Sequence, residues 1–155
     1  MAATAAQVEF FNENGYLIVP GLVSPREIER LKADMIGICR GKYPCREIAP
    51  LPDDVTDSEV LRSFLCIHQC HKISPFMLDV VKHPAVAEVL SRIIAPDVKC
   101  MQSMLFVKPP GFQGQAWHQD EMYIPTRDRS LCGAWIAIYA ATVQNGWRFV
   151  LPGSH

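Results

Sequence analysis

The sequence predicts an α+β protein in which a helical half, residues 1–97, precedes a half made of strands, residues 98–155. In the first half, apolar residues recur at helical spacing behind helix-start signals. From Val98 onward the apolar runs become short, aromatic or β-branched, and turn residues separate them. The length of 155 residues, with 49% hydrophobic and 20% charged, is typical of a single folded domain over residues 1–155.

Four helices are predicted from their start and stop signals. The clearest signal is Ser24-Pro25-Arg26-Glu27, a capping box with proline at the first helical position. The four are residues 4–14 ending at Gly15, a helix from Pro25 through Ile38, residues 75–81 behind Ser74, and a helix after His83-Pro84 that ends before Pro96. Residues 41–58 contain three prolines and no sustained period, which predicts a loop.

Five strands are predicted from β-branched and aromatic runs that turn residues bound. They are Tyr16–Val19, Met101–Val107, Ala116–Ile124, Leu131–Thr142 and Trp147–Leu151. Asn145-Gly146 is typical of a tight hairpin turn. Arg148 falls on the last of these strands, where its charge is costly to bury unless it faces solvent or a carboxylate.

Charge and hydropathy exclude several classes of partner. A formal net charge of -1 gives no electrostatic reason to expect nucleic acid or an anionic membrane surface. No apolar run approaches the roughly 20 residues that cross a bilayer, and the N-terminus has no signal-peptide pattern. We therefore expect a cytoplasmic protein with neither nucleic-acid nor membrane partners, and we expect its six cysteines to be free thiols.

Four potential metal ligands lie close together in the sequence, at Cys66, His68, Cys70 and His71. Such a cluster is compatible with a zinc site, although zinc sites usually gather two ligand pairs from separate segments. The alternative is that Cys66 and Cys70, spaced i and i+4, share the apolar face of a short helix.

The segment Trp117-His118-Gln119-Asp120 carries the most informative chemistry. On a strand, side chains two apart leave the same face, so His118 and Asp120 are predicted to project together while Gln119 faces away. An imidazole and a carboxylate are two of the three ligands in the facial triad of non-haem Fe(II) oxygenases. The alternative is a histidine that is merely hydrogen-bonded to a nearby carboxylate.

Several further segments match one family in order and spacing. They are Phe11 to Val19 with the capped helix, His71-Lys72-Ile73-Ser74-Pro75, Met101-Gln102-Ser103-Met104-Leu105 leading to Lys108-Pro109-Pro110, Trp117-His118-Gln119-Asp120, Ala134-Trp135, and Asn145-Gly146 with Leu151-Pro152-Gly153-Ser154-His155. Through them the sequence resembles the phytanoyl-CoA dioxygenase family of Fe(II)- and 2-oxoglutarate-dependent oxygenases. The resemblance implies N-terminal helices packed on a partial double-stranded β-helix barrel (jelly-roll, cupin-like), and a small-molecule substrate.

The same resemblance assigns roles to individual residues. His118 and Asp120 would be metal ligands, and Lys72, Met104 and Trp135 would lie against 2-oxoglutarate. A lysine supplies a point charge for a carboxylate, and the other two an apolar wall that excludes water. Without that function, Lys72 would be a solvated cation at a helix end, Met104 a core side chain and Trp135 a buried barrel aromatic.

Related enzymes complete the iron site with a second histidine and a nearby arginine, and neither is assigned in this sequence. His155 is expected to be a turn residue rather than a replacement ligand. Because such a barrel usually needs about 200–250 residues, we expect an incomplete, truncated domain that produces no succinate. The alternative is a non-catalytic chain that associates with a partner through its exposed strand edge.

Overall fold

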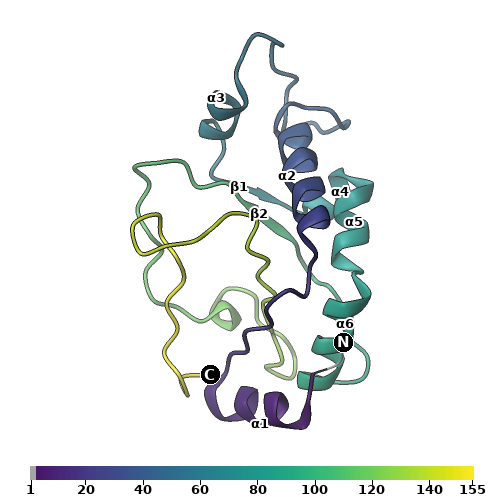
Figure 1. Ribbon diagram of the computed structural model, residues 1–155, viewed down its shortest axis with the longest axis vertical. Coiled ribbons are helices and arrows are strands. Elements are labelled where there is room, and N and C mark those ends of the chain that lie inside the picture. The colour runs from purple at the N-terminus through teal and green to yellow at the C-terminus, as the bar shows by residue number, and fades with distance from the viewer. Residues whose placement is uncertain (1–2) are drawn as a thin grey trace. The chain divides into compact units, whose positions relative to one another are not determined.

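The computed structural model describes residues 3–155, which form two compact units (Figure 1). Unit 1 contains the residues up to Val23, Pro84–Val98 and Gly114–His155. Unit 2 contains Ser24–His83 and Lys99–Gln113. Helices and one small sheet are both present, so the predicted mixture of α and β structure is confirmed.

Unit 2 begins with helix α2, Pro25–Cys39, which starts as its sequence predicts. The Ser24 hydroxyl accepts a hydrogen bond from the Glu27 backbone N–H, and the Glu27 carboxylate accepts one from the Ser24 N–H at 2.8 Å. Proline at the first position lacks only an N–H that would have no helical partner. The apolar face of α2 is buried and includes Leu31, Met35 and Ile38.

A short helix, α3 at Asp57–Arg62, follows the long loop and was not predicted. Its signal is nevertheless in the sequence, because Thr56 and Glu59 form a capping box like that of α2. The loop prediction over residues 41–58 is otherwise confirmed. Arg40 at the end of α2 is hydrogen-bonded to Asp57 at 2.6 Å, which ties the two helices together.

The sheet of unit 2 has two antiparallel strands, β1 at Cys66–His68 and β2 at Met104–Phe106. Ile67 pairs with Leu105, and both side chains are buried. Helices α4, Cys70–Ile73, and α5, Pro75–Val81, follow β1 (Figure 1). The prediction of α5 behind Ser74 is confirmed.

The suggestion that Cys66 and Cys70 share one helix face is wrong. Cys66 lies on β1 and Cys70 begins α4. Gln69 between them has φ 56°, a left-handed conformation that ends the strand and redirects the chain.

The most completely buried side chains of unit 2 are Ile38, Cys39, Val60 and Ser74. The polar member, Ser74, is fully hydrogen-bonded. Its hydroxyl donates to Asp34 on α2 at 2.6 Å and accepts from the N–H groups of Phe76 and Met77 at the start of α5. One serine therefore caps α5 and joins it to α2 without leaving a buried polar atom unpaired.

Unit 1 contains helices α1, Ala5–Asn14, and α6, Pro84–Ile93, which contact each other, and a single 3₁₀ turn, η1, at Asp120–Met122. Both helices are confirmed predictions. Gly15 ends α1 with φ 76° and its N–H donates to the carbonyl of Phe11. A Cβ at Gly15 would lie 2.5 Å from the His155 ring, so glycine is required both for the turn and for the close approach.

Four of the five predicted strands are wrong as strands. Met101–Val107 contains β2, whereas Tyr16–Val19, Ala116–Ile124, Leu131–Thr142 and Trp147–Leu151 are not strands in the structure. A strand, unlike a helix, forms its hydrogen bonds only with a neighbouring strand, and none lies beside these segments within residues 3–155. Asn145-Gly146 does form a turn, with Gly146 at φ 89°, but no strands flank it.

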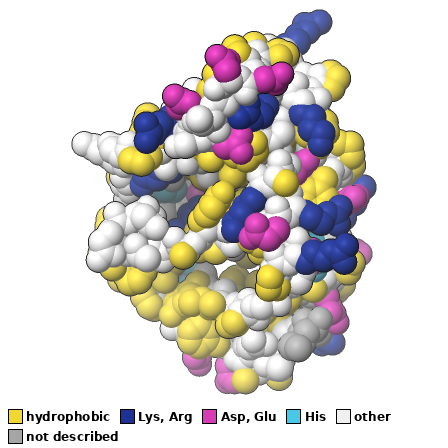
Figure 2. Space-filling model, turned by 45° about the horizontal axis from the view of Figure 1, so that its top comes forward, with side chains coloured by type: hydrophobic (Ala, Val, Ile, Leu, Met, Phe, Trp, Pro, Cys, Tyr) yellow, Lys and Arg dark blue, Asp and Glu magenta, His cyan; other side chains and the backbone are white. Residues whose placement is uncertain are grey.

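Large hydrophobic side chains remain exposed, as the yellow areas on the face in Figure 2 illustrate. Many belong to the segments that were predicted as strands and are not strands within residues 3–155, including Trp117, Tyr123, Trp135, Tyr139, Trp147 and Phe149. No helix within residues 3–155 is both long and apolar enough to span a bilayer.

Candidate metal centre

His118 and Asp120 of unit 1 face each other. Their Nε2 and Oδ1 atoms lie 3.3 Å apart. The prediction that the two side chains project together is therefore confirmed, but the reason given for it is wrong. His118 lies in irregular backbone and Asp120 begins η1, so the pair is brought together by the chain turning into the 3₁₀ helix rather than by strand alternation.

A hydrogen bond to the backbone fixes which nitrogen of His118 carries its proton. Nδ1 lies 2.7 Å from the Ala116 carbonyl oxygen, and because a carbonyl oxygen only accepts, Nδ1–H is the donor. In the neutral imidazole this leaves a lone pair on Nε2, directed at the Asp120 carboxylate. Two acceptors at this separation repel each other unless a positive charge lies between or beside them.

Either a second proton on His118 or a metal cation supplies that charge. First-row divalent metals bind imidazole nitrogen and carboxylate oxygen at about 2.0–2.2 Å, so two neighbouring ligands at right angles lie about 3 Å apart. The 3.3 Å separation fits this requirement. The backbone carbonyl that orients the ring is the kind of support that metal-ligating histidines have.

Glu121, next to the pair, holds the loop that follows it. Its carboxylate accepts hydrogen bonds from the Thr126 N–H and hydroxyl and from the Leu131 N–H at 3.1 Å. These bonds, chiefly those from Thr126, lower the pKa of the Glu121 carboxyl, which favours the charged acceptor. Glu121 was not predicted as a site residue, since no local sequence pattern marks a side chain that binds backbone groups five and ten positions further along.

Three further residues, Gln119, Tyr123 and Gly133, surround the pair or lie next to it in sequence. Gln119, between the two residues in sequence, donates to the carbonyl of Ser154. The Tyr123 ring contacts His118 edge to face, with ring centroids 5.6 Å apart. A Cβ at Gly133 would lie 3.6 Å from Oδ2 of Asp120, so the backbone of a later segment also approaches the carboxylate.

Trp135, in the same unit, is 51% exposed rather than a buried aromatic. The guanidinium of Arg148 lies over its ring, 5.3 Å from the centroid. Arg148 is exposed to solvent, which resolves the difficulty of burying its charge.

Lys72 and Met104 belong to unit 2. Lys72 is exposed in the last turn of α4, and Met104 occupies the exposed side of β2 opposite His68. Ser103 links their two elements: its hydroxyl lies 2.6 Å from His71 Nδ1 and 3.1 Å from Cys70 Sγ, and its carbonyl accepts from the Gln69 N–H. The five residues thus fall into two groups, His118, Asp120 and Trp135 in unit 1 and Lys72 and Met104 in unit 2.

Within residues 3–155, no three His, Cys, Asp or Glu side chains gather closely enough to hold a metal ion. The cluster that suggested zinc is divided between β1 and α4, and burial raises the pKa of the Cys66 and Cys70 thiols. Metal binding needs the thiolate, so this shift opposes zinc binding. All six cysteines are free thiols.

His155 lies against the end of α1. Its Nε2 is 3.2 Å from the carbonyl oxygen of Asn12, and its ring fills the space above Gly15. This contact to α1 accounts for its position in unit 1.

The protein is a candidate metal-dependent protein. It has a mixed helical and β fold, and its imidazole–carboxylate pair fits a divalent cation. The profile of the phytanoyl-CoA dioxygenase (PhyH) family matches residues 11–155, and the chain belongs to this family. No solved structure matches the chain significantly.

Curated relatives match along almost the whole chain. A probable phytanoyl-CoA dioxygenase of Caenorhabditis elegans is 29% identical, over 98% of this chain and 53% of the relative. The peroxisomal phytanoyl-CoA dioxygenase of Homo sapiens is 32% identical, over 98% of this chain and 47% of the relative. The phytanoyl-CoA dioxygenase domain-containing protein 1 of Danio rerio is 25% identical, over 98% of this chain and 65% of the relative. The chain spans about half the length of the first two relatives.

Proposed function

We propose that this chain is part of an Fe(II)- and 2-oxoglutarate-dependent dioxygenase that acts on a small molecule. The observation that carries the proposal is the His118–Asp120 pair, in which Nε2 and a carboxylate oxygen face each other at 3.3 Å, a separation that suits two ligands of one divalent cation. Membership of the phytanoyl-CoA dioxygenase family favours iron as that cation. The same membership supports a jelly-roll barrel as the fold of the complete domain.

Each candidate residue has a role that its chemistry supports. His118 and Asp120 would hold Fe(II), which together with 2-oxoglutarate supplies the oxygen activation that oxidises a substrate carbon. The Ala116 carbonyl keeps His118 in the tautomer that can bind metal. Lys72 would place its ammonium against a carboxylate of 2-oxoglutarate, and Met104 and Trp135 would exclude water from it.

The experiment that tests the proposal measures metal binding directly. Mn²⁺, a paramagnetic substitute for Fe(II), is titrated into the ¹⁵N-labelled chain while amide signals are followed. We expect selective broadening around His118 and Asp120. His118→Ala and Asp120→Ala should each abolish it, because one remaining ligand binds a divalent ion too weakly.

Two control variants make this result specific. His68→Ala and Asp97→Ala remove exposed side chains of the same types elsewhere in the chain and should leave the broadening unchanged. Broadening centred on other residues, or broadening that persists in Asp120→Ala, would contradict the proposed centre. With only two ligands assigned, we expect no succinate production by the 155-residue chain, and turnover that depends on His118 would overturn that expectation.

A second proposal, association with another chain, is favoured by the exposed aromatic side chains of unit 1. Trp117 and Phe149 have ring centroids 6.4 Å apart, and Trp147 and Phe149 5.8 Å. All three side chains are exposed. Apolar surface of this kind favours association, as do the unpaired edges of a two-stranded sheet.

A cytoplasmic location remains a prediction, and the bovine and human relatives are named as peroxisomal.

A further inference from the structure

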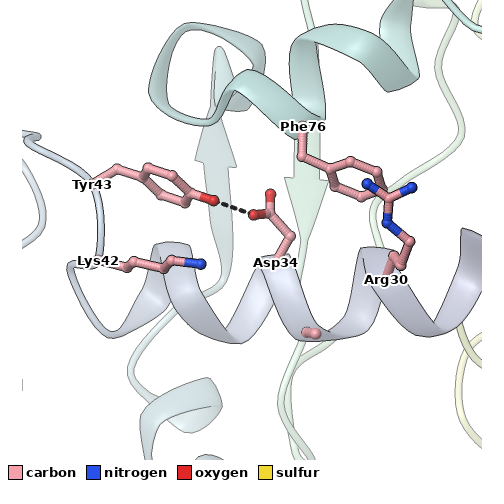
Figure 3. Close-up of a pocket in the computed structure, with 6 residues that line it drawn as sticks. Arg30, Asp34, Lys42, Tyr43 and Phe76 are labelled. Carbon is pink, nitrogen blue, oxygen red and sulfur yellow. Dashed lines mark hydrogen bonds between the residues drawn. The ribbon is translucent and has the colours of Figure 1, made fainter.

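Unit 2 contains a pocket that the proposed oxygenase site does not use. It is an open depression of about 310 Å³, lined by Arg30, Ala33, Asp34, Lys42, Tyr43 and Phe76 (Figure 3). Three of these come from α2, two from the segment after it and one from α5.

Two cations are held at this pocket, each beside an aromatic ring. The Arg30 guanidinium lies over Phe76, 4.4 Å from the ring centroid, and the Lys42 ammonium lies 5.4 Å from the centroid of Tyr43. Within residues 3–155, neither side chain has a hydrogen bond or an ion pair with a carboxylate. A guanidinium stacked by its face keeps its N–H edge free for an oxyanion.

A hydrogen-bonded carboxylate, that of Asp34, also lines the pocket. Asp34 is buried, and its two carboxylate oxygens accept hydrogen bonds from the Tyr43 hydroxyl and the Ser74 hydroxyl. Figure 3 shows Tyr43 and Lys42 extending toward Asp34 from one side, and Arg30 over Phe76 on the other. The network fixes the Tyr43 ring, and therefore the surface beside the Lys42 ammonium.

The charge of the lining residues favours an anionic ligand. Two cations and one carboxylate leave the pocket with one net positive charge, and the carboxylate is already satisfied by two hydroxyl donors. Neither cation is paired with Asp34, so both remain available to an anionic ligand. We propose that this pocket binds a small molecule with one oxyanion group, a phosphate or a carboxylate, on a flat apolar body that contacts Tyr43 and Phe76.

Binding is tested with small probes of the proposed chemistry. Phenyl phosphate and benzoate supply the two oxyanions on a flat ring, inorganic phosphate supplies the anion alone, and phenol supplies the ring alone. Each is titrated into the ¹⁵N-labelled full chain. We expect saturable shifts of the Lys42 and Tyr43 amides with the two ring-bearing anions, weaker binding of inorganic phosphate, and none with phenol. Tighter binding of phenyl phosphate would identify a phosphate ligand, and tighter binding of benzoate a carboxylate.

Exposed variants separate specific binding from loss of fold. Arg30→Gln and Lys42→Gln should each weaken binding by about tenfold, because each removes a charge-assisted contact. Lys32→Gln removes a charge from the same helix but does not line the pocket, and should leave affinity unchanged. The amide spectrum of each variant reports whether α2 is intact.

Gly37→Ala tests the geometry while keeping both charges. A Cβ at Gly37 would lie 3.1 Å from Cδ of Lys42, so the lysine stem must move. Alanine favours the helix, and weaker binding would therefore report displacement of Lys42 rather than unfolding. Unchanged affinity in the Arg30→Gln Lys42→Gln double variant, or shifts that do not centre on this pocket, would overturn the proposal.

Discussion

Glu27 shows how one charged side chain makes a helix start depend on pH. Hydrogen bonds from the Ser24 hydroxyl and then from the Ser24 N–H, with a smaller contribution from His83 at 3.1 Å, lower the pKa of this carboxyl from 4.5 to about 2. A carboxyl whose pKa is lower in the folded chain than in the unfolded chain stabilises the fold at pH values above its unfolded pKa. That stability is lost as the pH falls from about 4.5 toward 2.

Glu27→Gln keeps a hydrogen-bonding side chain in the capping box but removes its titration. The free energy of unfolding should therefore fall less between pH 5 and about 2 in this variant than in the natural chain. Urea unfolding at a series of pH values measures the difference. Glu9→Gln removes an exposed carboxylate that caps no helix start and should leave the natural slope unchanged. Parallel slopes for the natural chain and Glu27→Gln would show that Glu27 is not a source of acid lability.

The sequence predicted that His118 and Asp120 lie together, but it did not predict which groups hold them in place. The spacing of His118 and Asp120 indicated that they lie together, but on the basis of strand alternation, whereas the turn into η1 is what brings them to 3.3 Å. The contributions of the Ala116 carbonyl and of Glu121 depend on the path of the loop. No pattern of residue types specifies that path.

Among the elements, helices were predictable and strands were not. Capping boxes at Ser24 and Thr56, and the glycine after α1, are signals contained in a few consecutive residues. The run Leu131–Thr142 has the composition of a strand, but its conformation depends on a partner from elsewhere in the chain. Local patterns therefore located α1, α2, α5 and α6, whereas the short helices α3 and α4 were not predicted and β1 and β2 required pairing across nearly forty residues of sequence.

Helix α4, which carries Lys72, depends on Ser103 for its attachment to β2. The Ser103 hydroxyl accepts from the His71 N–H at 3.1 Å and bonds His71 Nδ1 at 2.6 Å. Ser103→Ala would leave these half-buried groups without that partner, so we expect a loss of about 1–3 kcal/mol in the free energy of unfolding. Hydrogen exchange at the Lys72 and Ser74 amides, which are bonded within this turn, should accelerate.

Ser91→Ala is the matched control for this prediction. Ser91 lies in α6, is partly exposed, and its hydroxyl donates only to the Glu88 carbonyl. Its loss should change stability by less than about 0.5 kcal/mol. Equal effects of the two substitutions would mean that Ser103 does not hold α4.

For the whole molecule, the exposed aromatic cluster of Trp117, Trp147 and Phe149 should determine behaviour in solution. Trp117 is 73% exposed and Phe149 64% exposed, which is unusual for large apolar side chains in contact with one another. Covering them by a second copy of the chain would remove apolar surface from water. We expect the sedimentation coefficient to rise between micromolar and millimolar concentration.

Substitution within this cluster tests whether it is the surface responsible. Trp117→Gln and Phe149→Gln should shift association to higher concentration, because each removes apolar area that association would bury. Phe112→Gln alters an exposed aromatic residue of unit 2 and should leave the concentration dependence unchanged. If the chain stays monomeric throughout, or if all three variants weaken association equally, the cluster is not an interface. If only the two cluster variants weaken it, the aromatic cluster is the surface that engages a second copy.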